Sequence, residues 1–379
     1  MSGEAQHPLL LSDRPDFEAG HPTVRLVDLF SGCGGLTLGV AQAAEAAGTA
    51  LEIPLAIDSD ADAGAVYESN FPKADFRQTT VGEFFGPRAG EPLADFELRV
   101  AEEVGTVTAL VGGPPCQGHS DLNNHTRRRD PKNALYGHMS RAAEVLQPQA
   151  VLIENVPAVQ HDKHAGEGVV ARVERELRGL GFDVASGVVA LAALGVAQRR
   201  RRHVLLAVRE GLTAPADVLA DLADRQDFRD LRWAIEDLVK AAPTGIDEPP
   251  RASAENRRRM QYLQDEGLVD LPNAERPRCH QADGHSYKSM YGRLSWDLPA
   301  QTVTSGFGSI GQGRYMHPSE IRALTPHEAA RIQGFPDYFD FSAIALRSSL
   351  ATMIGNAVPP QLSRSIFAEL LPDLTAAGD

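Results

Sequence analysis

The feature that most constrains the fold of this 379-residue chain is a repeated alternation of short apolar runs and helical segments. An apolar run at residues 24–29 leads through a Gly-rich turn into an Ala-rich segment at 36–47. A second run at 54–57 is followed in the same way by a helical segment at 61–69. Strands joined by helices favour parallel pairing, because each helix returns the chain to the same end of the sheet. The alternation therefore predicts an α/β fold with a doubly wound, mostly parallel sheet.

Further apolar runs predict the rest of this Rossmann-like sheet and its organisation. Strands are expected at 108–111, 150–153, 182–191 and 203–208, and later helices at 326–333 and 360–371. Periodicity weakens after residue 210, where Asp, Arg and Pro accumulate. We expect an N-terminal extension over 1–22, a main domain over 23–210, a smaller second domain over 211–324, and a segment over 325–379 whose helix returns to the main domain.

Composition excludes several classes of protein. With 42% hydrophobic and 23% charged residues, the chain matches folded globular proteins. It contains no apolar run near the roughly 18 residues of a membrane span and does not begin with a leader pattern, so a cytoplasmic protein without a membrane partner is expected. The three cysteines, Cys33, Cys116 and Cys279, show no paired spacing. Neither a disulfide framework nor a metal site is therefore predicted.

The charge distribution points to nucleic acid despite a net charge of −14. Residues 1–110 carry 18 acidic and 6 basic side chains, so most of the excess acid lies at the front of the chain. The remainder is nearly balanced and contains Arg runs at 127–129, 199–202 and 257–259. A single run is more often a solvated face, but three runs near the motifs below favour phosphate contacts.

A Gly-rich turn, Asp-Leu-Phe-Ser-Gly-Cys-Gly-Gly at 28–35, follows the first strand and opens a helix. A helix N-terminus in such a turn favours a carboxylate or phosphate. Thr37 stands where the dinucleotide fingerprint requires Gly or Ala, so S-adenosylmethionine is favoured over a nicotinamide or flavin. Asp58, at the end of the next strand, is placed to accept hydrogen bonds from ribose hydroxyls. The alternative is a surface acid that caps a helix.

A second set of motifs follows three other strands. In Gly-Gly-Pro-Pro-Cys-Gln at 112–117, two prolines stiffen the backbone and present Cys116 beyond a strand end. Glu154-Asn155-Val156 ends the next strand, and Gln-Arg-Arg-Arg-Arg at 198–202 follows another. Because the carboxyl ends of parallel strands share one edge of a sheet, a thiol, a carboxyl group and arginines are expected to converge there.

With these motifs in this order, the sequence resembles the DNA (cytosine-5) methyltransferase family. The resemblance covers about 26–209 and 293–367, and includes Arg293, Pro299, Thr302 and Gly-Asn-Ala-Val-Pro-Pro at 355–360. It implies an S-adenosylmethionine-dependent methyltransferase fold with a target-recognition domain between the catalytic segments. By the resemblance, the cofactor is held by Phe30, Ser31, Gly32, Gly34, Gly35, Asp58, Gln78, Leu135, Asn356 and Val358.

The resemblance also implies the chemistry. Cys116 would add to C6 of a flipped cytosine and make C5 nucleophilic, after which C5 takes the methyl group and S-adenosylhomocysteine is released. Glu154 would act at N3 of the base. Arg200 and Arg202 would favour the thiolate, with Arg202 also on the cytosine.

Double-stranded DNA is the expected partner. The loop residues Gln117, Ser120, Arg127, Arg128 and Arg129 would contact it near the flipped base, and Arg257, Arg258 and Arg314 would contact it from the second domain. Two positions depart from the family: His119, where Phe is common, and Gln78, where an acid often meets the adenine amino group. A transfer-RNA cytosine methyltransferase and an inactive DNA-binding relative remain alternatives. A restriction or phage-defence partner is left open.

Overall fold

The computed structural model describes residues 7–115, 135–164, 166–281 and 289–376. Contacts within the chain divide it into two compact units. The first, here called the sheet unit, comprises Pro15–Leu194, Arg201–Gln226 and Val358–Asp379. The other, here called the second unit, comprises Met1–Arg14, Gly195–Arg200 and Asp227–Ala357. The contact boundaries at 226 and 357 thus lie C-terminal to the limits of 210 and 324 expected from the sequence.

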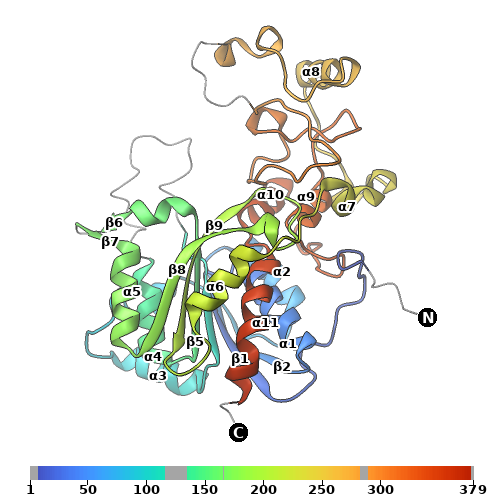
Figure 1. Ribbon diagram of the computed structural model, residues 1–379. Coiled ribbons are helices and arrows are strands. Elements are labelled where there is room, and N and C mark those ends of the chain that lie inside the picture. The colour runs from blue at the N-terminus through green and yellow to red at the C-terminus, as the bar shows by residue number, and fades with distance from the viewer. Residues whose placement is uncertain (1–6, 116–134, 165, 282–288, 377–379) are drawn as a thin grey trace. The chain divides into compact units, whose positions relative to one another are not determined.

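A seven-stranded sheet with the order β3-β2-β1-β4-β5-β9-β8 forms the centre of the sheet unit (Figure 1). The first five strands in this order pair in parallel, whereas β9 is antiparallel to both of its neighbours. Residues 191–200, between β8 and β9, contain a 3-10 turn at Leu191–Ala193 but no α-helix, so no helical crossover returns the chain to the opposite end of the sheet and the pairing is antiparallel. The strands are β1 Thr23–Leu29, β2 Ala50–Asp58, β3 Phe76–Gln78, β4 Ala109–Gly112, β5 Ala150–Asn155, β8 Phe182–Ala190 and β9 Arg201–Arg209. The predicted mixed α/β fold with a mostly parallel sheet is confirmed.

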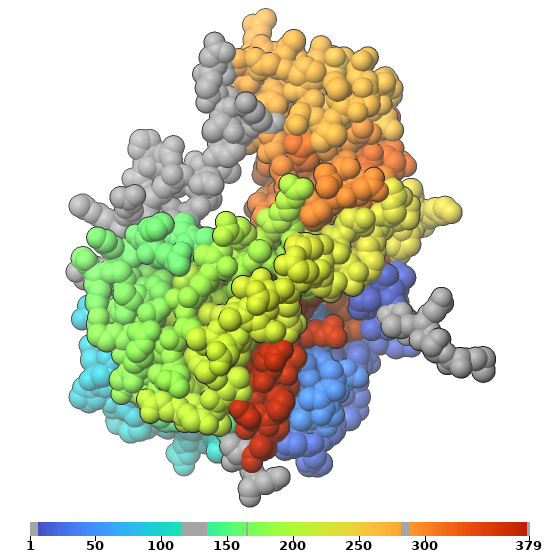
Figure 2. Space-filling model, viewed as in Figure 1, coloured from blue at the N-terminus to red at the C-terminus, as the bar shows by residue number. Residues whose placement is uncertain are grey.

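Helices cover both faces of this sheet. Helices α1 (Gly35–Ala46), α6 (Pro215–Asp224) and α11 (Pro360–Ala376) pack on one face, where Figure 2 shows α11 in red between α1 and α6. Helices α3 (Asp95–Val104), α4 (Gly137–Leu146) and α5 (Val169–Gly179) pack on the other. The remaining elements of the unit are α2 Ala61–Asn70, β6 Lys163–His164, β7 Glu167–Gly168, and the short 3-10 helices Val81–Glu83, Pro157–His161 and Leu191–Ala193.

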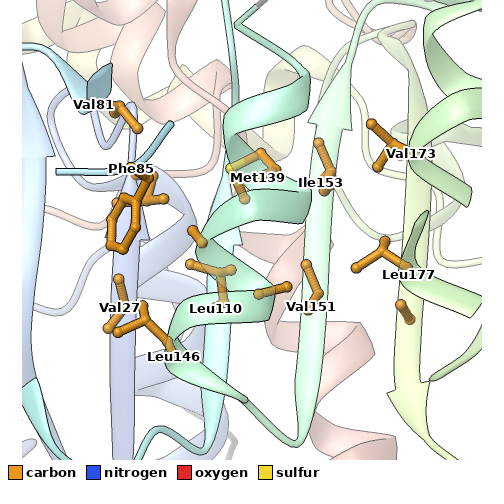
Figure 3. Close-up of a cluster of buried hydrophobic side chains, with 14 of the residues drawn as sticks. Val27, Val81, Phe85, Leu110, Met139, Leu146, Val151, Ile153, Val173 and Leu177 are labelled. Atoms are coloured by element: carbon orange, nitrogen blue, oxygen red, sulfur yellow. The ribbon is translucent and has the colours of Figure 1, made fainter. Parts of the chain in front are cut away.

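The core between the sheet and α4 explains why the central strands read as continuous apolar runs. Val27, Leu110 and Val151 project from neighbouring strands towards Met139 and Leu146 of α4 (Figure 3). All residues of β4 and β5 are buried. A strand that is covered on both faces needs apolar side chains on both faces. The polar residues therefore begin where the buried strand ends, at the edge of the sheet.

The C-terminal helix α11 packs tightly against α1. A Cβ on Gly39 would lie 2.1 Å from the carbonyl oxygen of Pro360, so only glycine permits this approach. Ser363 Oγ donates a hydrogen bond to the Leu36 carbonyl at 2.7 Å. The end of the chain is thereby held beside the helix that follows the Gly-rich turn.

The second unit is built from short helices around its own apolar cluster. That cluster contains Met260, Leu263, Leu271, Ile310 and Met316. Its helices are α7 Leu231–Ile235, α8 Ala254–Asp265, α9 Pro326–Ile332 and α10 Arg347–Asn356, with 3-10 turns at Asp237–Lys240, Gly245–Asp247, Asn273–Glu275, Arg278–His280 and Ile310–Gln312. Over the described ranges of the whole chain, no helix combines the length and the apolar character needed to cross a bilayer.

Candidate active site

The Gly-rich turn between β1 and α1 has a backbone conformation that depends on glycine. Phe30, Gly32 and Gly34 have φ values of 57°, 53° and 94°. A Cβ on Gly34 would lie 2.7 Å from the Phe71 ring, whereas a Cβ on Gly32 would have no neighbour within 4 Å. The turn is therefore packed against the protein at Gly34 and open at Gly32.

Asp58 supports this turn from the end of β2. Its Oδ2 accepts a hydrogen bond from the Gly32 amide at 2.8 Å, and its Oδ1 accepts one from the Asp60 amide at 2.9 Å. Burial raises the pKa of Asp58, while these amide donors oppose the shift. Gln78, at the end of β3, is its register partner and is exposed. The sheet thus brings together the two residues expected at the ribose and the adenine.

The surroundings of the turn fit a nucleoside ligand that carries a carboxylate. Ser31 is only 8% exposed, and its Oγ has no hydrogen-bond partner among the described residues. Helix α1 begins at Gly35 without a side-chain cap, which leaves its N-terminus available to an anion. Leu135 is half-buried just before α4. Within the described ranges, no group of three or more His, Cys, Asp and Glu side chains is arranged to hold a metal ion.

A buried hydrogen-bond chain lies under the turn and was not predicted from the sequence. Thr37 Oγ1 donates to Asp28 Oδ2 at 2.6 Å and lies 2.9 Å from the Tyr67 hydroxyl. Burial raises the pKa of Asp28 to about 8, with a smaller contribution from Asp58. Thr37, which in the sequence only argued against a dinucleotide, thus braces β1 against α1. Burial also raises the pKa of Cys33 to about 12, so this thiol stays protonated.

Glu154 and Arg202 form a close ion pair on neighbouring strands. Glu154 Oε1 lies 2.6 Å from Arg202 Nε, and the two side chains are 8% and 12% exposed. The pair satisfies the distance of an ion pair but not the angles of a hydrogen bond. In the β5–β9 register Glu154 is opposite Val204, so Arg202 projects from the same face one pleat further along. The structure brings together two of the predicted catalytic residues.

The segment that leads to Cys116 is held beside this pair. Asn155 Nδ2 donates to the Pro114 carbonyl at 3.0 Å. A Cβ on Gly113 would lie 3.4 Å from Glu154 Oε2 and 3.9 Å from Val358 Cγ2. Asn155 belongs to the Glu-Asn-Val motif at 154–156, and its hydrogen bond to Pro114 depends on the pairing of β4 with β5. Cys116, Gln117, His119, Ser120, Arg127, Arg128 and Arg129 lie outside the described residues.

Arg200 and Asn356 belong to the second unit. Arg200 is 2% exposed, and its guanidinium donates to the carbonyls of Val303, Gly355 and Ala357. Asn356 is exposed at the end of α10. The guanidinium of Arg200 thus donates to carbonyls of distant residues, whereas that of Arg202 pairs with Glu154 and donates to the carbonyl of its own neighbour Arg201.

The three arginines predicted to contact DNA from the second unit differ in their surroundings. Arg258 pairs with Glu275 at 2.9 Å, and Arg314 pairs with Asp270 at 2.6 Å. The side chain of Arg257 is exposed and has no hydrogen-bond or ion-pair partner in the described part of the chain. Arg257 therefore keeps its charge available to an anionic partner.

Comparison with known proteins gives a consistent result. The family model for C-5 cytosine-specific DNA methylase matches residues 24–371. The chain is 43% identical over 358 residues to type II methyltransferase M1.BsuMI of Bacillus subtilis (strain 168), covering 94% of this chain and 82% of that protein. It is 31% identical over 351 residues to type II methylase M.HgiDII of Herpetosiphon aurantiacus, covering 90% and 93%. In fold it is similar to the S. pombe Dnmt2 methyltransferase, with a TM-score of 0.63 at 17% identity over 93% of this chain and 99% of that one.

Proposed function

The chain belongs to the C-5 cytosine-specific DNA methylase family, and we propose that it transfers a methyl group from S-adenosylmethionine to C5 of cytosine in double-stranded DNA. The observation that carries the proposal is the Glu154–Arg202 pair at the edge of the sheet, beside the Gly113–Pro114 segment that leads to Cys116. The product would be 5-methylcytosine, with S-adenosylhomocysteine released.

The residues around the Gly-rich turn would bind the cofactor. S-adenosylmethionine would supply a methyl group activated by its sulfonium charge. Asp58 has unused lone pairs besides those that accept from Gly32 and Asp60, so it would accept hydrogen bonds from ribose hydroxyls. The Gln78 amide oxygen would accept from the adenine amino group, and Ser31 with the N-terminus of α1 would bind the carboxylate.

The catalytic steps follow from the weak nucleophilicity of cytosine C5. The thiolate of Cys116 would add to C6 of the base, and the electron pair displaced from the C5–C6 double bond makes C5 nucleophilic. In its protonated form Glu154 would donate a hydrogen bond to N3 and pass its proton to N3 as negative charge develops in the ring, and the carboxylate left behind would be paired with Arg202. Arg202, oriented by Glu154, would hold the cytosine. After methylation, C5 loses its proton and the thiolate leaves C6, which restores the aromatic ring.

The target base has to leave the duplex before Cys116 can reach it, so we propose that the enzyme flips the cytosine. Of the three arginines expected to contact DNA from the second unit, Arg257 is the one without an ion-pair partner in the described part of the chain, so we propose that it contacts phosphate. The type II names of the relatives support a role in DNA modification within a restriction or defence system. Since the proposed substrate is DNA, the expected location is the cytoplasm, at the nucleoid.

Transfer of tritiated methyl groups tests the proposal directly. The purified chain should label duplex DNA in the presence of S-adenosylmethionine, and it should not label transfer RNA. Label in transfer RNA alone would overturn the DNA substrate. DNA binding without any methylation would favour an inactive relative.

The covalent step has its own test. Cys116→Ser should abolish turnover and leave cofactor binding within about twofold, because the thiol acts on the base and not on the cofactor. A duplex containing 5-fluorocytosine should trap a covalent complex with the wild type, since fluorine at C5 cannot leave as the proton does. Full activity of Cys116→Ser would exclude the mechanism.

A further inference from the structure

Two side chains distant in sequence close the C-terminal end of α10 in the second unit. Gln333, which follows α9, donates through Nε2 to the Ile354 carbonyl at 2.5 Å. Arg200 donates to the Gly355 carbonyl at 3.3 Å and to the Ala357 carbonyl at 3.1 Å. The last carbonyls of a helix have no partner within the helix. Gln333 and Arg200 therefore supply donors that α10 lacks.

Gln198 joins these two residues into one buried network. Its Nε2 donates to Gln333 Oε1 at 2.6 Å, and its Oε1 accepts from the Val303 amide at 3.0 Å. Arg200 donates to the carbonyl of the same Val303 at 2.9 Å. Gln198, Arg200 and Gln333 are 0%, 2% and 0% exposed. We call these three residues the amide–guanidinium clamp. Loss of one donor in such a network leaves buried oxygens without partners.

The clamp contacts the chain at two positions from which it continues into the sheet unit. Arg200 is the last residue of the second unit before β9, and Ala357 is the last before Val358. The hydrogen bond from Arg200 to Ala357 ties these two positions to each other. In the sheet unit, the first chain segment continues to Arg202, which pairs with Glu154. The second segment continues to Val358, which lies beside Gly113.

We infer that Gln333 and Arg200 are positioning residues for the reaction, acting through the backbone segments that carry Arg202 and Val358 into the sheet unit. The inference rests on the proposed methyl transfer. It gives Arg200 a role different from that of Arg202, because its guanidinium donates in two directions to carbonyl oxygens rather than to a carboxylate. A lysine would keep the charge but not the planar fork that reaches several oxygens. Gln333 is uncharged, so it can share the effect of Arg200 only through the clamp.

The test compares Gln333→Met and Arg200→Lys with a matched control, Arg331→Lys. Methionine preserves the volume of Gln333 and removes its donors. Arg331 lies in α9, is 1% exposed and pairs with Asp337 and Asp237, outside the clamp. Both clamp variants should lower kcat by roughly 10- to 100-fold, as expected for a misplaced catalytic group, with KM for DNA within about threefold. Hydrogen exchange measured without DNA or cofactor should become faster for the amides of 353–358.

The control separates positioning from general stability. Arg331→Lys should lower the Tm but leave both the kcat of the folded fraction and the exchange at 353–358 unchanged. Gln333→Glu is a second variant of the same length, and its carboxylate facing the Ile354 carbonyl should lower kcat at least as far as Gln333→Met. The inference is overturned if Gln333→Met keeps wild-type kcat and exchange, or if, as in the control, its Tm falls while the kcat of the folded fraction stays at the wild-type value. If the wild-type protein methylates no DNA, the proposed function is wrong. The hydrogen-exchange comparison of Gln333→Met with Arg331→Lys would still test whether the clamp holds residues 353–358.

Discussion

Glu154 Oε1 lies 2.6 Å from Nε of Arg202, across the antiparallel pairing of β5 and β9. Glu154→Gln removes the charge that orients Arg202 and weakens the group proposed to act at N3 of cytosine. We expect kcat to fall by roughly 10²- to 10⁴-fold, the usual range for loss of general acid–base catalysis, with little change in KM for DNA. Single-turnover methyl transfer measures the effect. Glu174→Gln, which alters an acid of α5 bonded to Ser186, is the control and should keep wild-type kcat.

Asp58 connects the Gly-rich turn to the proposed cofactor site. In Asp58→Asn, one of the two oxygens that accept from the Gly32 and Asp60 amides becomes an NH₂ group that cannot accept. Loss of one charge-assisted hydrogen bond should weaken S-adenosylmethionine binding by about tenfold, measured by titration calorimetry. Asp60→Asn is the matched control, because asparagine still caps α2. Equal affinity of Asp58→Asn and wild type would contradict this role.

Arg257 and Arg314 should differ in their contribution to DNA binding. Among the described residues the Arg257 guanidinium has no hydrogen-bond or ion-pair partner, whereas Arg314 is paired with Asp270. If Arg257 contacts phosphate, Arg257→Gln should reduce the slope of log affinity against log salt by about 0.9. The slope for Arg314→Gln should change much less. Affinity measured on one duplex from low to high salt decides the question, and equal slopes for Arg257→Gln and wild type would exclude a phosphate contact.

His327 should make the second unit more stable in mild acid than in base. Its two ring nitrogens lie 2.8 Å from Asp247 Oδ1 and 2.9 Å from Asp337 Oδ1. Burial lowers the pKa of His327, but the two carboxylates outweigh it and raise the pKa above the usual value. A His pKa raised by folding stabilises the fold below the unfolded-state pKa, and this stability is lost as pH rises through the folded-state pKa.

The carboxylate partner sets the lower limit of this pH window. Burial raises the pKa of Asp337, but His327 and Arg331 outweigh it and lower the pKa to about 2, so Asp337 stays charged in mild acid. The difference in Tm between wild type and His327→Gln should therefore be larger at pH 5.5 than at pH 8.5. Thermal unfolding at the two pH values measures it. A difference that grows with pH would show that the histidine is not charged in the folded state.

Much of the sheet could be predicted because a buried strand requires a continuous run of apolar residues, which is visible in the local sequence. The apolar runs at 24–29, 54–57, 108–111, 150–153, 182–191 and 203–208 correspond to β1, β2, β4, β5, β8 and β9. Helices α1, α2 and α9 were also predicted at nearly the observed bounds, and α11 was predicted from its first residue but continues past 371 to Ala376. Helices α3, α4 and α5 were not predicted, although Val100 and Val104 of α3 and Val169, Val173 and Leu177 of α5 are buried at helical spacing. The three-residue strand β3 is too short to show a period.

The sequence by itself determined which chemical groups follow which strands, since each motif directly follows a run of apolar residues whose burial is a local property. It therefore placed Asp58 and Glu154 at the ends of their strands, whereas Arg202, expected to follow the run at 182–191, is the second residue of the antiparallel strand β9. Only the tertiary structure decided their partners. The Glu154–Arg202 pair depends on the register of β5 with β9, and the bond from Arg200 to Ala357 joins residues 157 positions apart. Such contacts depend on how segments that are distant in sequence pack together in the folded chain, and no local sequence pattern specifies that packing.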